Sequence, residues 1–430
     1  NRSQFTRMLG EAVELSQSTN RRIAVLLFNI DRFKDVNDSY GHSIGDEVLR
    51  HVSVQMQGAL RHGDIIGRLA GDEICVVAQS ICGRDSAVDV AERLMAAAGQ
   101  PWTTPDGLSV VVSVSAGICL YPDHALTADD LLQGAHAAVY GAKARGSNAW
   151  CFFHENMTQA ARERLALEAR LRRALELGHM RLYYQPQIEL ATGRLMGAEA
   201  LLRWLDPEEG LISPARFIPV AENSGVIGPL GLWVLGEACR QGQQWRAAGL
   251  PDLAIAVNVS LHQFLLTDIA GATAEALNKS GFPASLLELE ITESALAEKP
   301  EEALAVLNRL RELGLRLAID DFGTGYSSLA HLKRFPLDLL KIDQGFIRDI
   351  PHSADDMTIS SSVIALGHAM GLKVLAEGVE TQEQLTFLQQ KGCDYFQGYF
   401  CSRPLPAEDF TRLLEKTREG QPLVSVATVD

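Results

Sequence analysis

In the second half of the chain, polar residues stand near the carboxyl ends of successive apolar segments. In chain order they are Glu199, Asn258, Glu290, the adjacent pair Asp320 and Asp321, Lys341, Glu377 and Gln397. A single residue of this kind is often only a structural polar group, but seven segments in succession that end this way are hard to ascribe to chance. The pattern therefore indicates one shared site.

The charges of such a site limit its chemistry. Carboxylates that share a pocket raise one another's pKa unless cations separate them. Oxygen ligands with an asparagine amide suit Mg²⁺ or Mn²⁺ rather than zinc. Asp320 and Asp321 can supply ligands to two metals, and two metals about 3.5–4 Å apart are the usual device for in-line hydrolysis of a phosphodiester. Lys341 would add a fixed cation near the nucleophile or the phosphate.

These side chains can meet only if the strands that carry them end at one face. After Met180 the sequence contains eight strand candidates separated by helical stretches. They are RLYYQPQIEL, LMGAEALLRW, LAIAVNVS, LLELEITES, LRLAIDDFGTG, LLKIDQ, LKVLAEGVE and YFQGYF. Eight such units over about 240 residues match a (β/α)8, TIM-like barrel, in which the carboxyl ends of the strands converge on one face.

The first 150 residues predict an α/β domain of a different kind. The expected elements are a strand at 22–30, a helix at 45–60, a hairpin at 67–77, a helix at 86–99, a long strand at 108–120 and a helix at 127–146 that opens with a Thr/Asp cap. This β-α-β-β-α-β order is the ferredoxin-like pattern. The hairpin turn carries two carboxylates, Asp72 and Glu73.

Composition places limits on partners. The 430 residues are 47% hydrophobic and 22% charged, as in a soluble globular protein of two or three domains. The net charge of -15 argues against binding long nucleic acid through a broad basic surface.

The cysteines and the apolar runs indicate the compartment. The seven cysteines have no metal-site spacing, which fits a reducing cytoplasm. No apolar run approaches the roughly 20 residues of a membrane span, so no membrane contact is expected within this segment. The chain opens at Asn1, and an upstream sensor or membrane anchor stays open.

The predicted boundaries divide the chain into four parts. They are a first domain at 1–153, a connecting helix at 154–178, a barrel at 179–415 and a C-terminal tail at 416–430. The segment 154–178, rich in Ala, Leu, Arg and Glu, reads equally well as the first helix of the barrel domain.

The motifs EALLRW, NVS, ELEITES, DDFGTGYSSL, LKID, AEGVE and FQGYF resemble the full motif series of EAL-domain phosphodiesterases, over residues 171–410. Enzymes of that family hydrolyse cyclic di-GMP to the linear dinucleotide pGpG. The resemblance implies this activity, a two-metal site for Mg²⁺ or Mn²⁺, and a homodimer. The alternative is a catalytically silent cyclic di-GMP receptor, but the intact ligand set favours the enzyme.

The resemblance also implies a role for each matching residue. Glu199, Asn258, Glu290 and Asp320 would bind one metal, Asp320 and Asp321 would serve the second, and Glu377 would lie near the metals or their waters. Lys341 would orient the hydrolytic water and Arg203 would contact a substrate phosphate, while Gln185, Glu380 and Gln397 would line the pocket. Glu293 would steady the loop DFGTGYSS, and Glu288, two residues before Glu290, is expected to be structural.

The segments FNIDRFKDVNDSYGHSIGDEVL and RLAGDEI resemble the GGDEF domain of diguanylate cyclases, over residues 2–153. The resemblance implies that Asn37 and Asp46 read guanine, that Asp72 is a metal carboxylate and that Lys143 contacts phosphate. Three positions depart from the family. Asn29 replaces a metal-binding aspartate, Ala70 replaces the first glycine of the signature and is expected to hinder a nucleotide or strain the turn, and Ser147 replaces an arginine. We therefore expect GTP binding that regulates the barrel, with little or no cyclase activity.

A further pair precedes the hairpin. Arg61 and Asp64 lie at the spacing of the family's RxxD inhibitory site, where cyclic di-GMP binds away from the active centre. An arginine can pair with a phosphate and an aspartate can accept guanine N–H bonds. The alternative is an ordinary surface ion pair.

Overall fold

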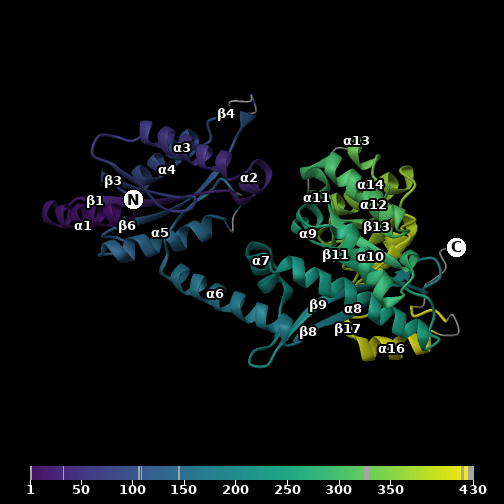
Figure 1. The fold of residues 1–430 in the computed structure, drawn as a ribbon. Helices are drawn as coiled ribbons and strands as arrows, with labels where there is room; N and C mark the ends of the chain where they lie inside the picture. The colour runs from purple at the N-terminus through teal and green to yellow at the C-terminus, as the bar shows by residue number, and fades with distance from the viewer. Residues whose placement is uncertain are drawn as a thin grey trace. The chain divides into compact units, whose positions relative to one another are not determined.

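The computed structural model describes residues 2–31, 33–104, 107, 109–143, 146–323, 329–417 and 421–424. The chain separates into two compact units, Asn1–Ala166 and Leu167–Asp430, which are described one at a time (Figure 1). Among the described residues, no helix is both long enough and apolar enough to cross a membrane.

The first unit is an α/β domain whose main sheet has the order β2-β3-β1-β6-β7. Its strands are β1 (Arg22–Ile30), β2 (Ile65–Ala70), β3 (Glu73–Ile81), β6 (Val114–Tyr121) and β7 (Trp150–Phe152). Its helices are α1 (Arg2–Thr19), α2 (Phe33–Tyr40), α3 (His42–Gly58), α4 (Arg84–Ala98) and α5 (Ala128–Lys143). The order β2-β3-β1-β6 is that of a ferredoxin-like sheet, as the sequence predicts.

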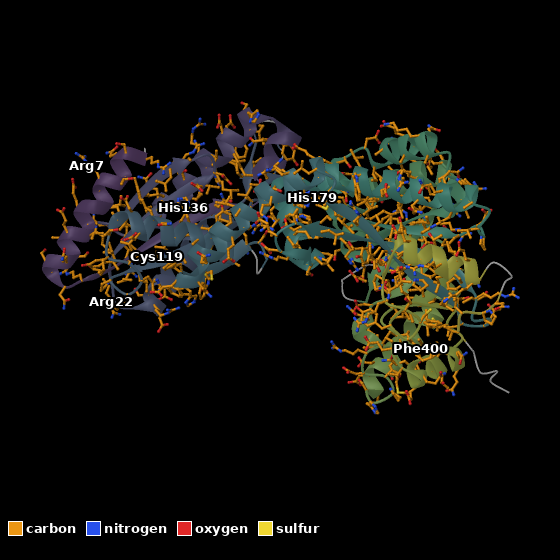
Figure 2. All side chains as sticks on the ribbon, turned by 90° about the horizontal axis from the view of Figure 1, so that it is seen from below. Arg7, Arg22, Cys119, His136, His179 and Phe400 are labelled. Atoms are coloured by element: carbon orange, nitrogen blue, oxygen red, sulfur yellow. The ribbon has the colours of Figure 1, made fainter. Side chains whose placement is uncertain are left out.

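The central strand β1 explains why this part of the fold could be predicted. Leu26 and Phe28 pack in a core with α3 and α4, whereas Val25 and Leu27 pack in a second core with α1 and α5. A strand that is buried on both faces reads as a continuous apolar run. The thiol of Cys119, on β6 beside β1, is buried as expected, and burial raises its pKa to about 12 (Figure 2).

The predicted long strand at 108–120 is interrupted. The short strand β5 (Ser109–Val110) pairs with β4 (Trp102–Thr103) in a separate ladder, and β6 starts only at Val114. At the interruption the Ser113 hydroxyl donates to Asp31 Oδ2 at 2.6 Å, and the Asp31 backbone N–H donates to the Ser113 carbonyl at 2.9 Å. These bonds tie the chain to the end of β1 before β6 begins.

The acidic hairpin forms as predicted, with one correction. Strands β2 and β3 pair antiparallel, and Ala70 faces Glu73 across the turn. The left-handed position belongs to Gly71, with φ +48°, and Ala70 is an ordinary strand residue. The expectation that Ala70 strains the turn is therefore wrong, because its backbone lies outside the left-handed region that excludes a Cβ.

The second unit is a closed eight-stranded barrel in the order β9-β11-β12-β13-β14-β15-β16-β8, closed by pairing of β8 with β9. The barrel strands are β8 (Met180–Glu189), β9 (Leu195–Asp206), β11 (Ala254–Val259), β12 (Leu287–Thr292), β13 (Arg316–Phe322), β14 (Leu339–Ile342), β15 (Lys373–Ala376) and β16 (Tyr395–Phe396). Strand β8 runs antiparallel to both neighbours, and the other neighbouring pairs are parallel. The eight apolar segments of the sequence thus become the eight strands, although the sequence does not show the direction of the first.

Helices and short strands complete the unit around the barrel (Figure 1). They are α6 (Glu155–Glu176), which starts in the first unit, β10 (Gly210–Ile212), α7 (Pro214–Ser224), α8 (Ile227–Ala247), α9 (Leu261–Leu266), α10 (Ile269–Ser280), η1 (Ala284–Leu286), α11 (Glu293–Glu298), α12 (Pro300–Glu312), α13 (Leu329–Leu332), η2 (Gln344–Phe346), α14 (Ala354–Ala369), α15 (Gln382–Gln390), β17 (Leu405–Pro406) and α16 (Ala407–Lys416).

The two faces of each barrel strand have different chemistry. In β12, Leu287, Leu289 and Ile291 join the large apolar core between strands and helices. Successive side chains of a strand point to opposite faces. Glu288 and Glu290 therefore point into the barrel, where a TIM barrel ordinarily has bulky branched residues.

Candidate functional site

The centre of the site is Lys341, whose side chain is fully buried inside the barrel. Its ammonium lies 2.7 Å from a carboxylate oxygen of Glu290, 2.7 Å from Glu377 and 3.1 Å from Asp320. A fourth carboxylate, that of Glu199, lies 3.9 Å away. These residues come from β9, β12, β13, β14 and the end of β15, so the barrel gathers side chains that are far apart in sequence.

Two amides hold the Glu199 carboxylate in place. The Asn258 side-chain N–H₂ donates to Oε1 at 2.6 Å, and the Gln397 amide donates to Oε2. The Gln397 amide also donates to Oε1 of Gln185 at 3.0 Å, and Nε2 of Gln185 donates to the Ser402 carbonyl at 3.2 Å. Glu199, Asn258, Gln185 and Gln397 are thus parts of one hydrogen-bonded network.

Burial and repulsion compete with Lys341 in setting the charges of the site. Burial raises the pKa of Glu290 well above its ordinary value, because Lys341 compensates only part of that effect. Burial also raises the pKa of Glu377 to about 8. For Glu199, Lys341 and the two amide donors outweigh burial and lower the pKa. Burial opposes the charge on Lys341 itself, but the surrounding carboxylates outweigh it and raise the pKa of the ammonium.

The residues present fit divalent cations. Carboxylate oxygens of Asp320, Asp321 and Glu377 lie within 4.8 Å of one another. Asp321 has a left-handed backbone, φ +53°, and burial together with the Asp320 charge raises its pKa. Oε1 of Glu290 is buried and has no hydrogen-bond partner among the described residues. A cation would supply that missing partner and relieve the repulsion between carboxylates.

The predicted substrate contacts lie less close together. The Arg203 guanidinium donates to the Leu202 carbonyl at 2.8 Å and stands 5.6 Å from the centre of the Tyr183 ring. Burial lowers the pKa of Arg203. Glu380 is exposed, and its backbone N–H donates to the Gln384 side chain at 2.7 Å.

The predicted loop anchor meets the start of its loop. The buried Glu293 carboxylate accepts the backbone N–H of Gly323 at 2.9 Å, one residue after β13 ends. Gly323 has φ +100°, a conformation that favours glycine. Residues 324–328, the rest of the predicted loop DFGTGYSS, lie outside the described residues.

In the first unit, the predicted nucleotide residues lie on separate elements. Asn37 is on α2, and a Cβ added at Gly45 of α3 would lie 1.9 Å from its Oδ1. Asp46 is exposed on α3, and Asp72 is in the hairpin turn. The ammonium of Lys143, at the end of α5, donates to Oδ1 of Asn29 at the end of β1.

The Asp64 carboxylate of the predicted inhibitory pair already has backbone partners. Its Oδ2 accepts the Arg61 backbone N–H and its Oδ1 accepts the Gln79 backbone N–H, both at 3.0 Å. The pair is therefore joined through the backbone of Arg61, whose side chain is exposed.

Family comparisons match both units. The EAL domain model matches residues 168–404, more than half of the chain. The chain belongs to the EAL domain family. A model of the diguanylate cyclase GGDEF domain matches residues 1–149, so the EAL domain follows a GGDEF domain.

Relatives of this GGDEF–EAL chain include proteins described as cyclic di-GMP enzymes. It is 42% identical over 408 residues to the bifunctional diguanylate cyclase/cyclic di-GMP phosphodiesterase MucR of Pseudomonas aeruginosa. This match covers 95% of the chain and 59% of MucR. It is 38% identical over 414 residues to the cyclic di-GMP phosphodiesterase PdeR of Escherichia coli, with 96% and 61% covered. The chain therefore spans about three fifths of these relatives.

Solved EAL structures resemble the barrel. The PaMucR phosphodiesterase in complex with c-di-GMP superposes with a TM-score of 0.56 at 45% identity, covering 57% of this chain and 99% of that one. The EAL enzyme Bd1971, in its cAMP- and cyclic-di-GMP-bound form, gives 0.57 at 26% identity, covering 73% and 92%.

Two positioning residues of the GGDEF–EAL chain were not singled out from the sequence. In the GGDEF domain, the Asp31 carboxylate accepts the hydroxyls of Ser113 and Ser115 and the backbone N–H of Asn148. In the EAL domain, a Cβ added at Gly398 would lie 2.1 Å from the Val379 carbonyl oxygen, so this glycine lets the loop after β15 approach β16. Its place in the motif FQGYF was the only available signal.

Proposed function

We propose that this chain is a metal-dependent phosphodiesterase that hydrolyses cyclic di-GMP to pGpG. The observation that carries the proposal is the group of four carboxylates around Lys341, which includes a buried Glu290 oxygen without a hydrogen-bond partner in the described part of the chain. One buried ammonium cannot neutralise four carboxylates, and this negative excess suits divalent cations. The membership of the EAL phosphodiesterase family supports the same reaction.

The metals would be Mg²⁺ or Mn²⁺. Glu199, Asn258, Glu290, Asp320, Asp321 and Glu377 would hold them through their carboxylate oxygens and through the side-chain oxygen of Asn258, whose N–H₂ binds Glu199. When bound, such a metal pair neutralises phosphoryl oxygens and makes a nucleophile from water at neutral pH.

The chain's own side chains would position the reactants. Gln397 and Asn258 fix both oxygens of Glu199, so this carboxylate does not reorient when a ligand binds. Lys341 keeps Glu290 and Glu377 close together and presents a fixed positive charge beside the reacting water. Arg203, which has no carboxylate partner among the described residues, is available for a substrate phosphate.

The reaction can be tested directly. The full chain is incubated with cyclic di-GMP and Mg²⁺ or Mn²⁺, and pGpG is quantified by chromatography. Glu199→Gln should lower the rate by roughly a thousandfold, because it removes a charged ligand of a metal that stabilises the transition state by several kcal/mol. Glu237→Gln, a surface carboxylate paired with Arg240, is the matched control and should keep the rate. Cyclic di-GMP binding without pGpG from the wild type would instead support a silent receptor.

We also propose that the GGDEF domain binds GTP, which modulates the barrel, and makes little or no cyclic di-GMP. Support comes from the end of β1, where Asn29 accepts a hydrogen bond from Lys143 instead of offering a carboxylate to a metal. A neutral amide is a weaker metal ligand than a carboxylate. Titration with GTP, with product analysis and hydrolysis rates in parallel, tests this. Cyclic di-GMP formed from GTP would refute the expected lack of cyclase activity. A hydrolysis rate that does not change with GTP would refute the proposed regulation of the barrel.

A further inference from the structure

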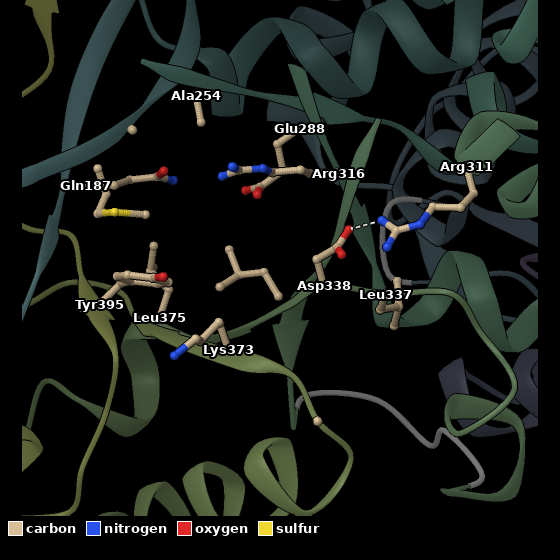
Figure 3. Close-up of a pocket in the computed structure, with 14 residues that line it drawn as sticks. Gln187, Ala254, Glu288, Arg311, Arg316, Leu337, Asp338, Lys373, Leu375 and Tyr395 are labelled. Carbon is tan, nitrogen blue, oxygen red and sulfur yellow. Dashed lines mark hydrogen bonds and ion pairs between the residues drawn. The ribbon is translucent and has the colours of Figure 1, made fainter. Parts of the chain in front are cut away.

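The barrel contains a cavity at the end opposite the group of carboxylates around Lys341. It has a volume of about 530 Å³ and is lined by residues at the amino ends of β9, β11, β12, β13, β14, β15 and β16, together with Gln187 near the carboxyl end of the antiparallel β8 (Figure 3). The cavity exists because small residues, Gly197 and Ala254, stand where a TIM barrel is ordinarily filled by bulky branched side chains. At Gly197 even a Cβ would lie 2.6 Å from the Gln187 side-chain oxygen.

Two buried polar side chains, Glu288 and Gln187, and the exposed Arg316 face this cavity, and within the described part of the chain no hydrogen bond or ion pair satisfies the Glu288 carboxylate, the Gln187 Nε2 or the Arg316 guanidinium. Glu288 is 6% exposed, and its carboxylate forms no hydrogen bond or ion pair with the described residues. Gln187 is 6% exposed, and its Nε2 is buried without a hydrogen-bond partner in the same set. The Arg316 guanidinium points across the cavity toward the Gln187 amide, and the Glu288 carboxylate lies beside it (Figure 3). Buried polar groups without partners are rare in proteins, because each costs the free energy of its lost hydration.

The other charged groups of the rim are already paired. Lys373 binds Asp394 at 2.7 Å, and Arg311 forms an ion pair with Asp338, which also accepts the Leu317 backbone N–H. The remaining wall is apolar or aromatic. Leu339, Leu375 and Tyr395 belong to one small apolar cluster inside the barrel, and Met196 lies on the rim.

We propose that this cavity binds a single guanine base, as guanosine or a guanine mononucleotide. A carboxylate next to two N–H donors is complementary to an edge with adjacent N–H groups followed by a carbonyl oxygen. Guanine has such an edge: its N1–H and N2–H₂ pair with Glu288, and its O6 accepts from Gln187 or Arg316. The ring packs against Leu375 and Tyr395, as flat apolar bodies do in small-molecule sites.

The cavity is separate from the carboxylate site but adjacent to it along the strands. Glu288, Leu339 and Leu375 precede Glu290, Lys341 and Glu377, respectively, by two residues. They therefore lie on the same inner face of the barrel, one layer lower. The guanine proposal rests on this lower layer alone and does not depend on the reaction proposed for the other end of the barrel.

Calorimetric titration of the full chain with guanosine and with GMP, in the presence of EDTA, tests the proposal. We expect guanosine to bind saturably. Adenosine should bind with an affinity at least about tenfold lower, because it lacks the second N–H donor and the carbonyl. GMP compared with guanosine shows whether a phosphate adds affinity. Glu288→Gln should weaken guanosine binding about tenfold or more, because it turns a charge-assisted acceptor into an amide that competes for the same donors.

Met196→Trp is a second, independent variant, because it fills the cavity from its half-buried rim without altering the polar groups. It should also abolish guanosine binding while thermal melting shows an intact fold. The titrations use an Asn37→Ala background, so that guanosine bound at the guanine site proposed for the GGDEF domain is not counted. Arg348→Gln, which changes an exposed arginine after β14, should leave guanosine binding unchanged. No saturable guanosine binding, or binding that survives both Glu288→Gln and Met196→Trp, would overturn the proposal.

Discussion

At the scale of single residues, Lys341 is the most demanding feature of the molecule. A fully buried ammonium loses its hydration, a cost of several kcal/mol that only close opposite charges can offset. Here carboxylate oxygens of Glu290, Glu377 and Asp320 lie 2.7–3.1 Å from its nitrogen. The lysine therefore acts on stability as well as on the proposed chemistry, and the two effects can be separated.

Lys341→Met should destabilise the EAL domain by about 3 kcal/mol, because it leaves several buried carboxylates without a cation. The loss should be partly reversed by Mg²⁺ or Mn²⁺, since these ions supply the missing positive charge. Urea unfolding with and without the metal measures both effects. Lys373→Met is the control: that side chain is 62% exposed and forms an ion pair with Asp394, and its loss should cost under about 1 kcal/mol. Equal losses in the two variants would contradict this account.

At the scale of elements, the close approach of the loop after β15 to β16 depends on Gly398. Glu377 lies in the loop after β15 and Gln397 directly follows β16, so the separation of these two segments sets part of the carboxylate site. The Val379 backbone N–H donates to the Gln397 carbonyl at 3.1 Å, and a Cβ at Gly398 would overlap the same Val379 backbone.

Gly398→Ala should therefore cost about 1–3 kcal/mol of stability, as overpacking does, and should lower kcat more than it changes KM. Steady-state kinetics and urea unfolding measure this. Gly236→Ala provides the matched control, because Gly236 lies in α8 with open space at its Cβ, and alanine there should stabilise the helix by up to about 1 kcal/mol. A Gly398→Ala variant with unchanged kcat would refute the positioning role.

The packing of α6 against the β9–β10 hairpin depends on an ion pair with a defined pH range. Arg170 contacts Asp206 at 2.8 Å. Burial opposes the charge on Asp206, but Arg170 and the backbone N–H groups of Glu208 and Glu209 outweigh it and lower the pKa from 3.8 to about 2. A carboxyl whose pKa falls on folding stabilises the protein above its unfolded pKa, and this contribution is lost as the pH falls through the folded pKa.

The free energy of unfolding of the wild type should thus exceed that of Asp206→Asn by roughly 1–2 kcal/mol at pH 6. This difference should shrink as the pH falls from 4 to 2. Urea unfolding of both proteins at several pH values measures it. Asp252→Asn, which removes a 61% exposed carboxylate paired with Arg246, should show little difference at any pH. A difference for Asp206→Asn that stays constant down to pH 2 would exclude this explanation.

At the scale of the whole molecule, the two units have separate hydrophobic cores. The GGDEF domain has one core on each face of its sheet, and the EAL domain has its own core around the barrel. Scanning calorimetry of the full chain should show two unfolding transitions. Mg²⁺ or Mn²⁺ at about 100 times its dissociation constant should stabilise only the EAL domain, by about 2.7 kcal/mol. A single transition that shifts as a whole on metal addition would contradict this prediction.

The sequence predicts more of the architecture than of the site geometry. Buried strands such as β1 and β12 carry long apolar patterns. The turns and helical stretches between these patterns show where each strand begins and ends. The direction of β8 has no such signal, because an antiparallel strand in a closed barrel is as apolar as a parallel one. Likewise the residue types at Glu199 and Glu290 could be read as ligands, but the position of Lys341 among all four carboxylates depends on three-dimensional closure of the barrel.

The hollow lower layer of the barrel escaped sequence analysis for a different reason. Gly197 and Ala254 are small residues in ordinary strand patterns, and a cavity arises only when the strands that carry them face one another. The sequence predicts a structural role for Glu288. Within the described residues its carboxylate has no hydrogen bond or ion pair, so the guanosine titration also tests that prediction.

The buried ammonium of Lys341 also has a practical consequence for handling the protein. Because Lys341 balances part of the charge of the carboxylates around it, we expect the barrel to close without a divalent ion. A chelator should therefore yield a folded, inactive preparation that can be stored, exchanged into a chosen metal and returned to activity without a refolding step.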